Sequence, residues 1–199
     1  MLWEGRNDMK RLVFALAATA PFVAMAAAIP LASAADDKVV RSGEGAAVEN
    51  PFHPITLLLS KSENEGAVTV YEFEVPAQSP GSPPHTHANE DEHFFIVEGE
   101  LSVMSGDTVT TLGPGDFAAL NRGNTHMFWN ASDAPVRLIM TTTGGSFEEF
   151  MASVAPTLAE AKPADAMAAG AVLGQLAAEH GITIAMDQMP EEAAPFYGQ

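Results

Sequence analysis

Short apolar runs alternate with turn-forming residues from position 51 to position 143. Within the runs, apolar and polar side chains alternate as in half-buried β-strands, and Gly, Pro, Asn and Asp fill the breaks. The pattern predicts strands over residues 55–60, 67–75, 93–97, 100–105, 108–112, 116–120, 126–130 and 136–142. Because these strands are short, evenly spaced and tightly connected, we predict one all-β domain over residues 51–143, an antiparallel sandwich or barrel.

The apolar spacing becomes helical after position 145. Ser146 and Glu149 stand three residues apart at the start of this segment. They predict a capping box, in which each side chain accepts a hydrogen bond from a free backbone N–H. Gly181 predicts the end of a second helix, because glycine readily adopts the left-handed conformation there. We therefore predict a helical C-terminal extension over residues 144–199, with helices at about 146–161 and about 164–180 and no clear element after residue 189.

The first 34 residues have the pattern of a signal peptide. Lys10 and Arg11 precede a long stretch of apolar and small residues, and a small-residue cleavage motif follows. Met9 is then the expected true start, and residues 35–50 the expected flexible lead-in. A membrane-spanning helix is the alternative, but two prolines and the cleavage motif count against it. We expect an exported protein, periplasmic or secreted, with no stable membrane span after cleavage.

Composition narrows the function classes. The 199 residues include no cysteine, which excludes disulfide scaffolds, thiolate zinc sites, iron–sulfur clusters and cysteine nucleophiles. There are 26 acidic and 9 basic residues, so the formal net charge is −17. Such a chain repels phosphate backbones, and we expect no nucleic-acid partner.

One segment places three polar side chains together. His85 and His87 are two residues apart on backbone that the preceding prolines keep extended, so both project from the same face. Glu92 begins the next strand in phase with Phe94 and Ile96, which directs its carboxylate toward the apolar interior. A buried carboxylate is costly unless a positive group faces it.

A second segment supplies a further ligand. His126 shares a strand face with Phe128 and Asn130. Three imidazoles and one carboxylate suit a single divalent transition metal, and Fe, Mn, Ni, Co, Cu and Zn are not distinguished by such a set. Glu90 competes with Glu92 as the carboxylate ligand, but we expect Glu90 to lie in the turn and Glu92 to point inward.

These residues resemble the two motifs of the cupin superfamily. The first, G-x5-H-x-H-x3,4-E-x6-G, matches His85, His87, Glu92 and Gly99, although only three residues separate Gly81 from His85. The second, G-x5-P-x-G-x2-H-x3-N, matches Gly115, Gly123, His126 and Asn130, with Asn121 in place of the proline. The resemblance implies a small antiparallel β-barrel of cupin, or jelly-roll, type with His85, His87, Glu92 and His126 as metal ligands.

Within the superfamily, the single β domain with a helical tail resembles the quercetin 2,3-dioxygenase-like monocupins. That resemblance implies a dioxygenase acting with O2 on an enolic or phenolic, flavonol-like small molecule. Glu92 would accept the substrate's hydroxyl proton, and Phe94, Ile96 and Phe128 would line a substrate pocket and exclude water. Two alternatives stay open: a non-redox metal-dependent isomerase or decarboxylase, and a non-catalytic cupin that binds a metal or small ligand. A homodimer also stays open, because exposed edge strands can pair.

The other histidines and Arg122 have simpler interpretations. His93 should face away from Glu92, and His53 lies between prolines before the first predicted strand. His180 falls at a helix end, where it suits the helix dipole. Arg122 is either an exposed turn residue or a binding group for an anionic substrate.

Overall fold

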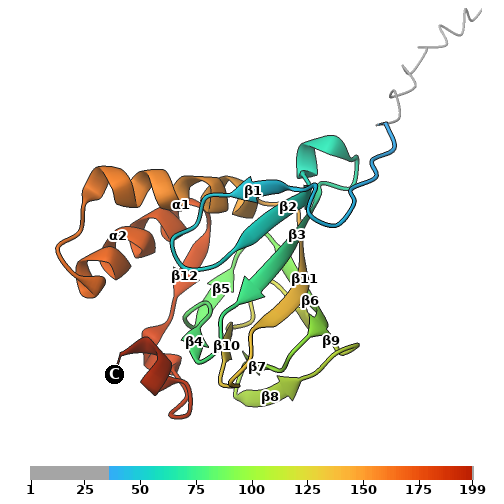
Figure 1. Cartoon of the computed structure of the whole chain (residues 1–199). Coiled ribbons are helices and arrows are strands. Elements are labelled where there is room, and N and C mark those ends of the chain that lie inside the picture. The colour runs from blue at the N-terminus through green and yellow to red at the C-terminus, as the bar shows by residue number, and fades with distance from the viewer. Residues whose placement is uncertain (1–35, 199) are drawn as a thin grey trace, which may run out of the picture. The chain divides into compact units, whose positions relative to one another are not determined.

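The computed structural model describes residues 36–198 (Figure 1). The predicted signal peptide lies outside these residues and stays a prediction. The described chain is mostly β-structure, followed by two helices, α1 (Phe147–Ala161) and α2 (Ala166–Glu179). The all-β class and the helical extension are confirmed.

The strands form two antiparallel sheets. The first has the order β1 (Ala46–Val48), β2 (Ile55–Leu59), β3 (Val68–Val75), β11 (Val136–Thr143), β6 (Asp91–Glu98) and β9 (Phe117–Leu120). The second has the order β12 (Ile182–Ile184), β5 (His85–His87), β10 (His126–Asn130), β7 (Leu101–Ser105) and β8 (Thr108–Leu112), with β4 (Ser79–Pro80) beside β10. Short 3₁₀-helices occupy Lys61–Glu63, Met186–Gln188 and Ala194–Tyr197.

The two sheets enclose the core as a jelly-roll sandwich. In the part of the chain that the structure describes, they remain separate sheets, with β9 and β8 at open edges. The predicted antiparallel fold is therefore confirmed, as a sandwich without the closed ring of strands of a barrel. Along β6 and β11, buried side chains that face the core alternate with more exposed ones that face outward. The buried residues Phe94, Ile96, Leu138 and Met140 belong to this core.

The C-terminal extension is packed into the same core. Helix α1 contributes Phe147 and Met151, helix α2 contributes Ala177, and β12 contributes Ile182. Figure 1 shows the two helices beside each other, with β12 next to β5. The extension therefore packs closely against the β domain.

The last residues cover the outer face of the second sheet. Outward-facing Met127 and Trp129 of β10 are buried in a second apolar cluster with Phe196 and Tyr197. The Tyr197 hydroxyl donates to the backbone oxygen of Ser82 at 2.6 Å. The segment after residue 189, for which we predicted no clear element, forms a 3₁₀-helix because these contacts hold it.

Two sequence predictions are corrected here. Residues 46–48 of the predicted flexible lead-in form β1, whose backbone satisfies the free edge of β2. The predicted capping box does not form, since the Ser146 side chain makes no cap bond. Instead, Glu149 pairs with Lys61, and the Ser146 N–H donates to Glu90.

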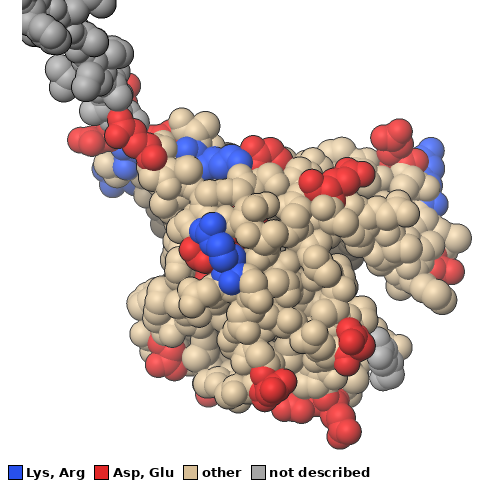
Figure 2. Space-filling view, turned by 180° about the vertical axis from the view of Figure 1, so that it is seen from behind, with Lys and Arg blue, Asp and Glu red and all other residues tan. Residues whose placement is uncertain are grey.

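The surface carries its charge in scattered positions. Figure 2 shows acidic side chains spread over one face, with few basic ones among them. Neither α-helix within residues 36–198 has the length and hydropathy needed to cross a membrane.

Candidate metal centre

Three strands bring the predicted ligands together between the sheets. β5 carries His85 and His87, and β10, which pairs with β5 at His126 and His85, carries His126. Glu92 reaches them from β6 in the opposite sheet, on the inward face that it shares with Phe94. All four side chains are buried, with exposed fractions of 5% for His85, 0% for His87, 1% for Glu92 and 0% for His126.

The local sequence holds β5 in place on both sides. Gly81 lies directly against the Phe128 ring, where a Cβ atom would overlap it, so the chain can enter beside β10. The prolines at 83 and 84 favour extended backbone before His85. On the other side, β12 pairs with β5 through Ile182 and His87. The motif histidines therefore sit on a strand that is fixed at both edges.

The potential ligand atoms of the four residues lie within 4.8 Å of one another. His85 Nε2 is 3.0 Å from His87 Nε2, and His126 Nε2 is 3.0 Å from Glu92 Oε2. The same carboxylate oxygen is 3.9 Å from His87 Nε2 and 4.0 Å from His85 Nε2. Adjacent ligands held about 2.1 Å from one octahedral ion lie about 3 Å apart, so these separations suit a single ion.

The hydrogen bonds of the Nδ1 atoms show which nitrogen carries the hydrogen in the rings of His85 and His126. His85 Nδ1 is 2.8 Å from the Pro83 carbonyl oxygen, and His126 Nδ1 is 3.1 Å from that of Asn124. A carbonyl oxygen only accepts, so both Nδ1 atoms donate. In the neutral ring this leaves the Nε2 lone pair directed into the cluster, which is the arrangement that a metal-ligating histidine requires.

The electrostatics of the cluster reflect burial and close pairing. Burial, with the neighbouring His126, lowers the pKa of His85 to about 3, against the effect of Glu92. Burial by itself would raise the pKa of Glu92, but the hydrogen bond from His126 and the histidine charges outweigh it and hold that pKa at about 2. Burial would lower the pKa of His126, yet its bond to Glu92 raises it. The hydrogen bond between His126 and Glu92 thus stabilises the charged form of both groups.

The donor set fits a divalent ion. The Nε2 atoms of His85 and His87 face each other at 3.0 Å, and a cation bound between them would accept a lone pair from each. Glu92 and the nearby Glu90, 1% and 0% exposed, are both acidic, and no lysine or arginine within residues 36–198 is buried. The cluster is compatible with one metal ion, and its nitrogen and oxygen donors leave the identity of the metal open.

Glu90 is the residue whose importance the sequence did not reveal. We expected it in the turn before β6, and its backbone is there, but its side chain is 0% exposed. Its Oε2 atom lies 3.4 Å from His87 Nδ1. The group of four potential ligands includes Glu92 and does not include Glu90. The Glu90 side chain is held by the backbone N–H of Ser146, just before α1. Glu90 and Ser146 are far apart in the sequence, so no short-range pattern reveals this contact.

The predicted pocket residues belong to the packed interior. Phe94, Ile96 and Phe128 are 0%, 0% and 3% exposed, and the Phe94 and Phe128 rings meet edge to face at 5.2 Å. Phe147 of α1 covers His87 at a ring separation of 5.3 Å. The cluster of four potential ligands, His85, His87, Glu92 and His126, therefore lies among apolar side chains.

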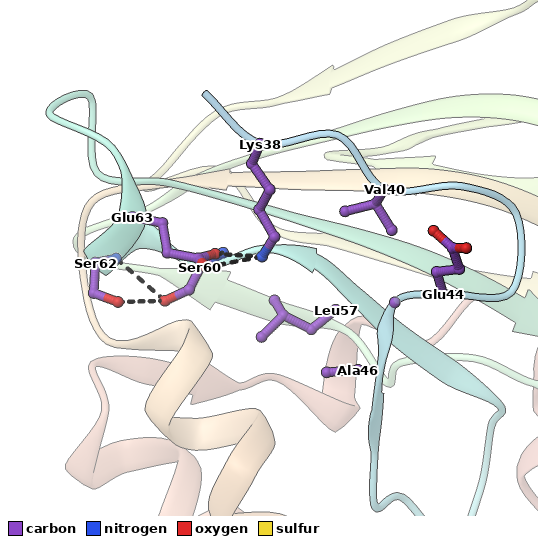
Figure 3. Close-up of a pocket in the computed structure, with 9 residues that line it drawn as sticks. Lys38, Val40, Glu44, Ala46, Leu57, Ser60, Ser62 and Glu63 are labelled. Atoms are coloured by element: carbon purple, nitrogen blue, oxygen red, sulfur yellow. Dashed lines mark hydrogen bonds and ion pairs between the residues drawn. The ribbon is translucent and has the colours of Figure 1, made fainter. Parts of the chain in front are cut away.

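Two hollows in the described part of the chain lie away from this cluster. The larger, about 340 Å³, is bounded by residues 38–46, Leu57 and the turn that contains Ser60 and Glu63 (Figure 3). Its Lys38 pairs with Glu63 at 2.6 Å. The smaller, about 270 Å³, lies along β8 and β9. Neither is lined by a residue of the metal cluster.

The remaining candidates have structural roles. His93 faces outward and stacks on Phe117, His53 makes a hydrogen bond to the Pro80 oxygen, and His180 caps α2. Arg122 lies on the surface and pairs with Asp91 at 2.8 Å, which favours the exposed-turn interpretation.

Comparisons with known proteins agree with the geometry. Residues 71–142, which include all four cluster residues, match the family model of the cupin domain. No curated protein sequence matches significantly.

Among solved structures, the chain is similar to a sugar phosphate isomerase from a cupin superfamily of Silicibacter pomeroyi. The identity is 26%, the match covers 46% of this chain and 59% of the other, and the TM-score is 0.42. A predicted oxalate decarboxylase from Thermotoga maritima is 21% identical, with 54% of this chain and 99% of the other covered and a TM-score of 0.48. The polyketide cyclase RemF from Streptomyces resistomycificus is 24% identical, with 54% of this chain and 80% of the other covered and a TM-score of 0.46. With TM-scores below 0.5, these similarities do not bear on the reaction.

Proposed function

We propose that this chain, which contains a cupin domain over residues 71–142, is a metal-dependent dioxygenase that acts on an enolic or phenolic, flavonol-like small molecule. The observation that carries the proposal is the buried cluster of three imidazoles and one carboxylate inside an aromatic and aliphatic interior. Four protein ligands leave up to two positions of an octahedral ion open, which catalysis requires.

The surroundings of the cluster favour an uncharged ring substrate over an anionic one. No lysine or arginine is buried in the described residues, so a phosphate or carboxylate group would find no buried basic partner. A phenol or enol can enter such an interior in its neutral form. Because Phe147 and the strands enclose the cluster, entry requires this cover to move.

Each step assigned to the chain follows from where its groups lie. His85, His87, His126 and Glu92 would hold the metal, which when bound supplies Lewis acidity and a redox centre for O2. The carboxylate of Glu92, ionised and buried at the cluster, would accept the hydroxyl proton of the substrate. Phe94, Ile96 and Phe128 would flank the ring and keep water from the reacting atoms.

The test is oxygen consumption by reconstituted protein. Metal-free protein is loaded separately with Fe²⁺, Mn²⁺, Co²⁺, Ni²⁺, Cu²⁺ and Zn²⁺, and O2 uptake is followed with flavonols and catechol-like phenols. We expect uptake with at least one redox-active metal, both ¹⁸O atoms in the product when ¹⁸O2 is used, and loss of turnover in Glu92→Gln. The matched control, His93→Asn on the outward face of β6, should retain turnover.

Three outcomes contradict the proposal. Conversion of substrate without O2 would indicate an isomerase or decarboxylase. Metal binding with no turnover of any of these compounds would indicate a binding protein. A product with fewer than two labelled oxygen atoms would exclude dioxygenation.

We also infer that the protein acts outside the cytoplasm, because residues 1–34 have the charged, apolar and small-residue segments of a signal peptide. When the full chain is expressed in a Gram-negative host, the intact mass of the periplasmic protein should correspond to a chain starting near residue 35. Protein that keeps residues 9–34 and stays in the cell would contradict export.

A further inference from the structure

A second carboxylate stands directly behind the metal cluster. Glu90 is 0% exposed, and one of its oxygens accepts the backbone N–H of Ser146, the residue that precedes α1. Its other oxygen, Oε2, lies 3.4 Å from His87 Nδ1. Neither Oε2 nor this Nδ1 has a hydrogen-bond partner of good alignment, although both are buried. His87 Nδ1 can therefore donate a hydrogen to Glu90 Oε2, and each atom gains the hydrogen-bond partner that it lacks.

The chain around Glu90 is shaped to hold a carboxylate there. Gly145 has a φ of +57°, and a Cβ atom at this position would overlap the Glu90 side chain. Glycine is therefore required both for the conformation and for the space.

A buried carboxylate is costly without a compensating partner, and no lysine or arginine of the described residues is buried. His87, whose Nδ1 lies 3.4 Å away, is the neighbouring group that would offset the carboxylate if a metal ion were held at its other nitrogen. A carboxylate that accepts from the outer N–H of a ligating histidine fixes the tautomer and orientation of the ring and increases the basicity of the ligand.

We propose that Glu90 is the positioning residue for His87: it accepts the Nδ1 hydrogen and so directs the Nε2 lone pair to the metal, while the start of α1 holds Glu90. The inference rests on the metal site of the proposed function and is independent of the dioxygenase reaction. It makes the C-terminal extension part of the metal site, because the contact that fixes Glu90 comes from the residues just before α1.

The test uses Glu90→Gln, because glutamine keeps the size of the side chain and an oxygen for the Ser146 N–H. Its amide nitrogen then faces His87 Nδ1, and two donors oppose each other unless the ring moves its hydrogen to Nε2, the ligand position. Metal-free wild-type and variant proteins are titrated with Co²⁺ in competition with a chelator. We expect one Co²⁺ per chain in wild type and a 10- to 100-fold weaker affinity in Glu90→Gln.

Glu148→Gln is the matched control. Glu148 also lies at the start of α1 and accepts from Ser60, Lys61 and Thr69, but its partners are not metal ligands. Glutamine keeps the size of this side chain and an accepting oxygen, and it leaves the bond between the Ser146 N–H and Glu90 in place. The Co²⁺ affinity of Glu148→Gln should therefore be unchanged.

A second measurement locates the hydrogen of His87 directly. In Zn²⁺-loaded wild-type protein labelled with ¹⁵N-histidine, NMR should show the hydrogen of His87 on Nδ1, in the low-field position of a proton shared with a carboxylate. In Glu90→Gln, where that variant folds, this resonance should shift or disappear.

The outcomes separate the two proposals. Equal Co²⁺ affinity in wild type and Glu90→Gln, equal losses in Glu90→Gln and Glu148→Gln, or a His87 hydrogen on Nε2 would overturn the role of Glu90 alone. Failure of wild type to bind Co²⁺ or Zn²⁺ would overturn the metal site itself, and the role of Glu90 with it.

Discussion

Phe147→Ala tests whether the C-terminal extension is an integral part of the β domain. Phe147 is 6% exposed, and its ring contacts those of His87, Tyr71 and Phe150 at centroid separations of 5.3, 6.3 and 5.9 Å. The truncation removes a buried ring where α1 meets the sandwich. Phe→Ala changes of this kind cost about 3–5 kcal/mol, through lost burial and the cavity that remains. For a domain of this size each kcal/mol lowers Tm by about 2–4 °C, so the expected decrease is roughly 6–20 °C.

Urea unfolding of the metal-free protein measures this cost without the contribution of a bound ion. Far-UV circular dichroism follows all elements together, and the fluorescence of Trp129, 2% exposed under the C-terminal residues, reports on the second sheet. Met167→Ala in the same extension is the control, because Met167 is 83% exposed and its truncation should cost less than about 0.5 kcal/mol. A loss below about 1 kcal/mol for Phe147→Ala, or separate transitions for helices and sheets in wild type, would refute the packing described above.

Three further predictions concern the metal-free protein. Burial on folding lowers the pKa of His85 from 6.5 to about 3, so between these pH values the unfolded chain binds a proton that the folded chain does not. The free energy of unfolding should therefore fall as the pH decreases from 6.5 toward 3, and His85→Asn should flatten this slope in urea titrations at stepped pH. An unchanged slope would argue against the buried neutral ring. Asn130→Ala removes donors to three backbone carbonyls and should cost about 3 kcal/mol in the same assay, whereas a cost under about 1 kcal/mol would show that those carbonyls find other partners. Gly145→Ala should destabilise far more than Gly106→Ala, because the two share φ values of +57° and +56° but only the first meets a side chain, Glu90, within overlap distance; similar costs would disprove the close approach.

The sequence predicted those features that short-range patterns determine. Strand alternation identified the inward faces of β6 and β10, and with them the direction of Glu92 and His126. The prolines before His85 correctly indicated extended backbone at β5. These features depend on local backbone preference and on a side-chain period of two, both of which can be recognised in one sequence.

The features that it did not predict depend on contacts between distant segments. β12 has three residues, too few for a periodic signal, and forms because β5 has a free edge. The capping box at Ser146 was wrong because Glu90, distant in sequence, takes the N–H and Lys61 takes Glu149. The separation into two sheets depends on which strands pair with each other, and alternation along each strand does not encode the pairing.

The metal content of the purified protein tests the central claim most directly. Untagged protein, prepared without a metal-affinity resin and offered a mixture of divalent ions, is dialysed and analysed by inductively coupled plasma mass spectrometry alongside His126→Ala and His53→Ala. Cooperation of His85, His87, Glu92 and His126 predicts one transition-metal ion per chain in wild type and in His53→Ala, and a large loss in His126→Ala. Background metal in all three proteins, or the same content in His126→Ala as in wild type, would contradict it.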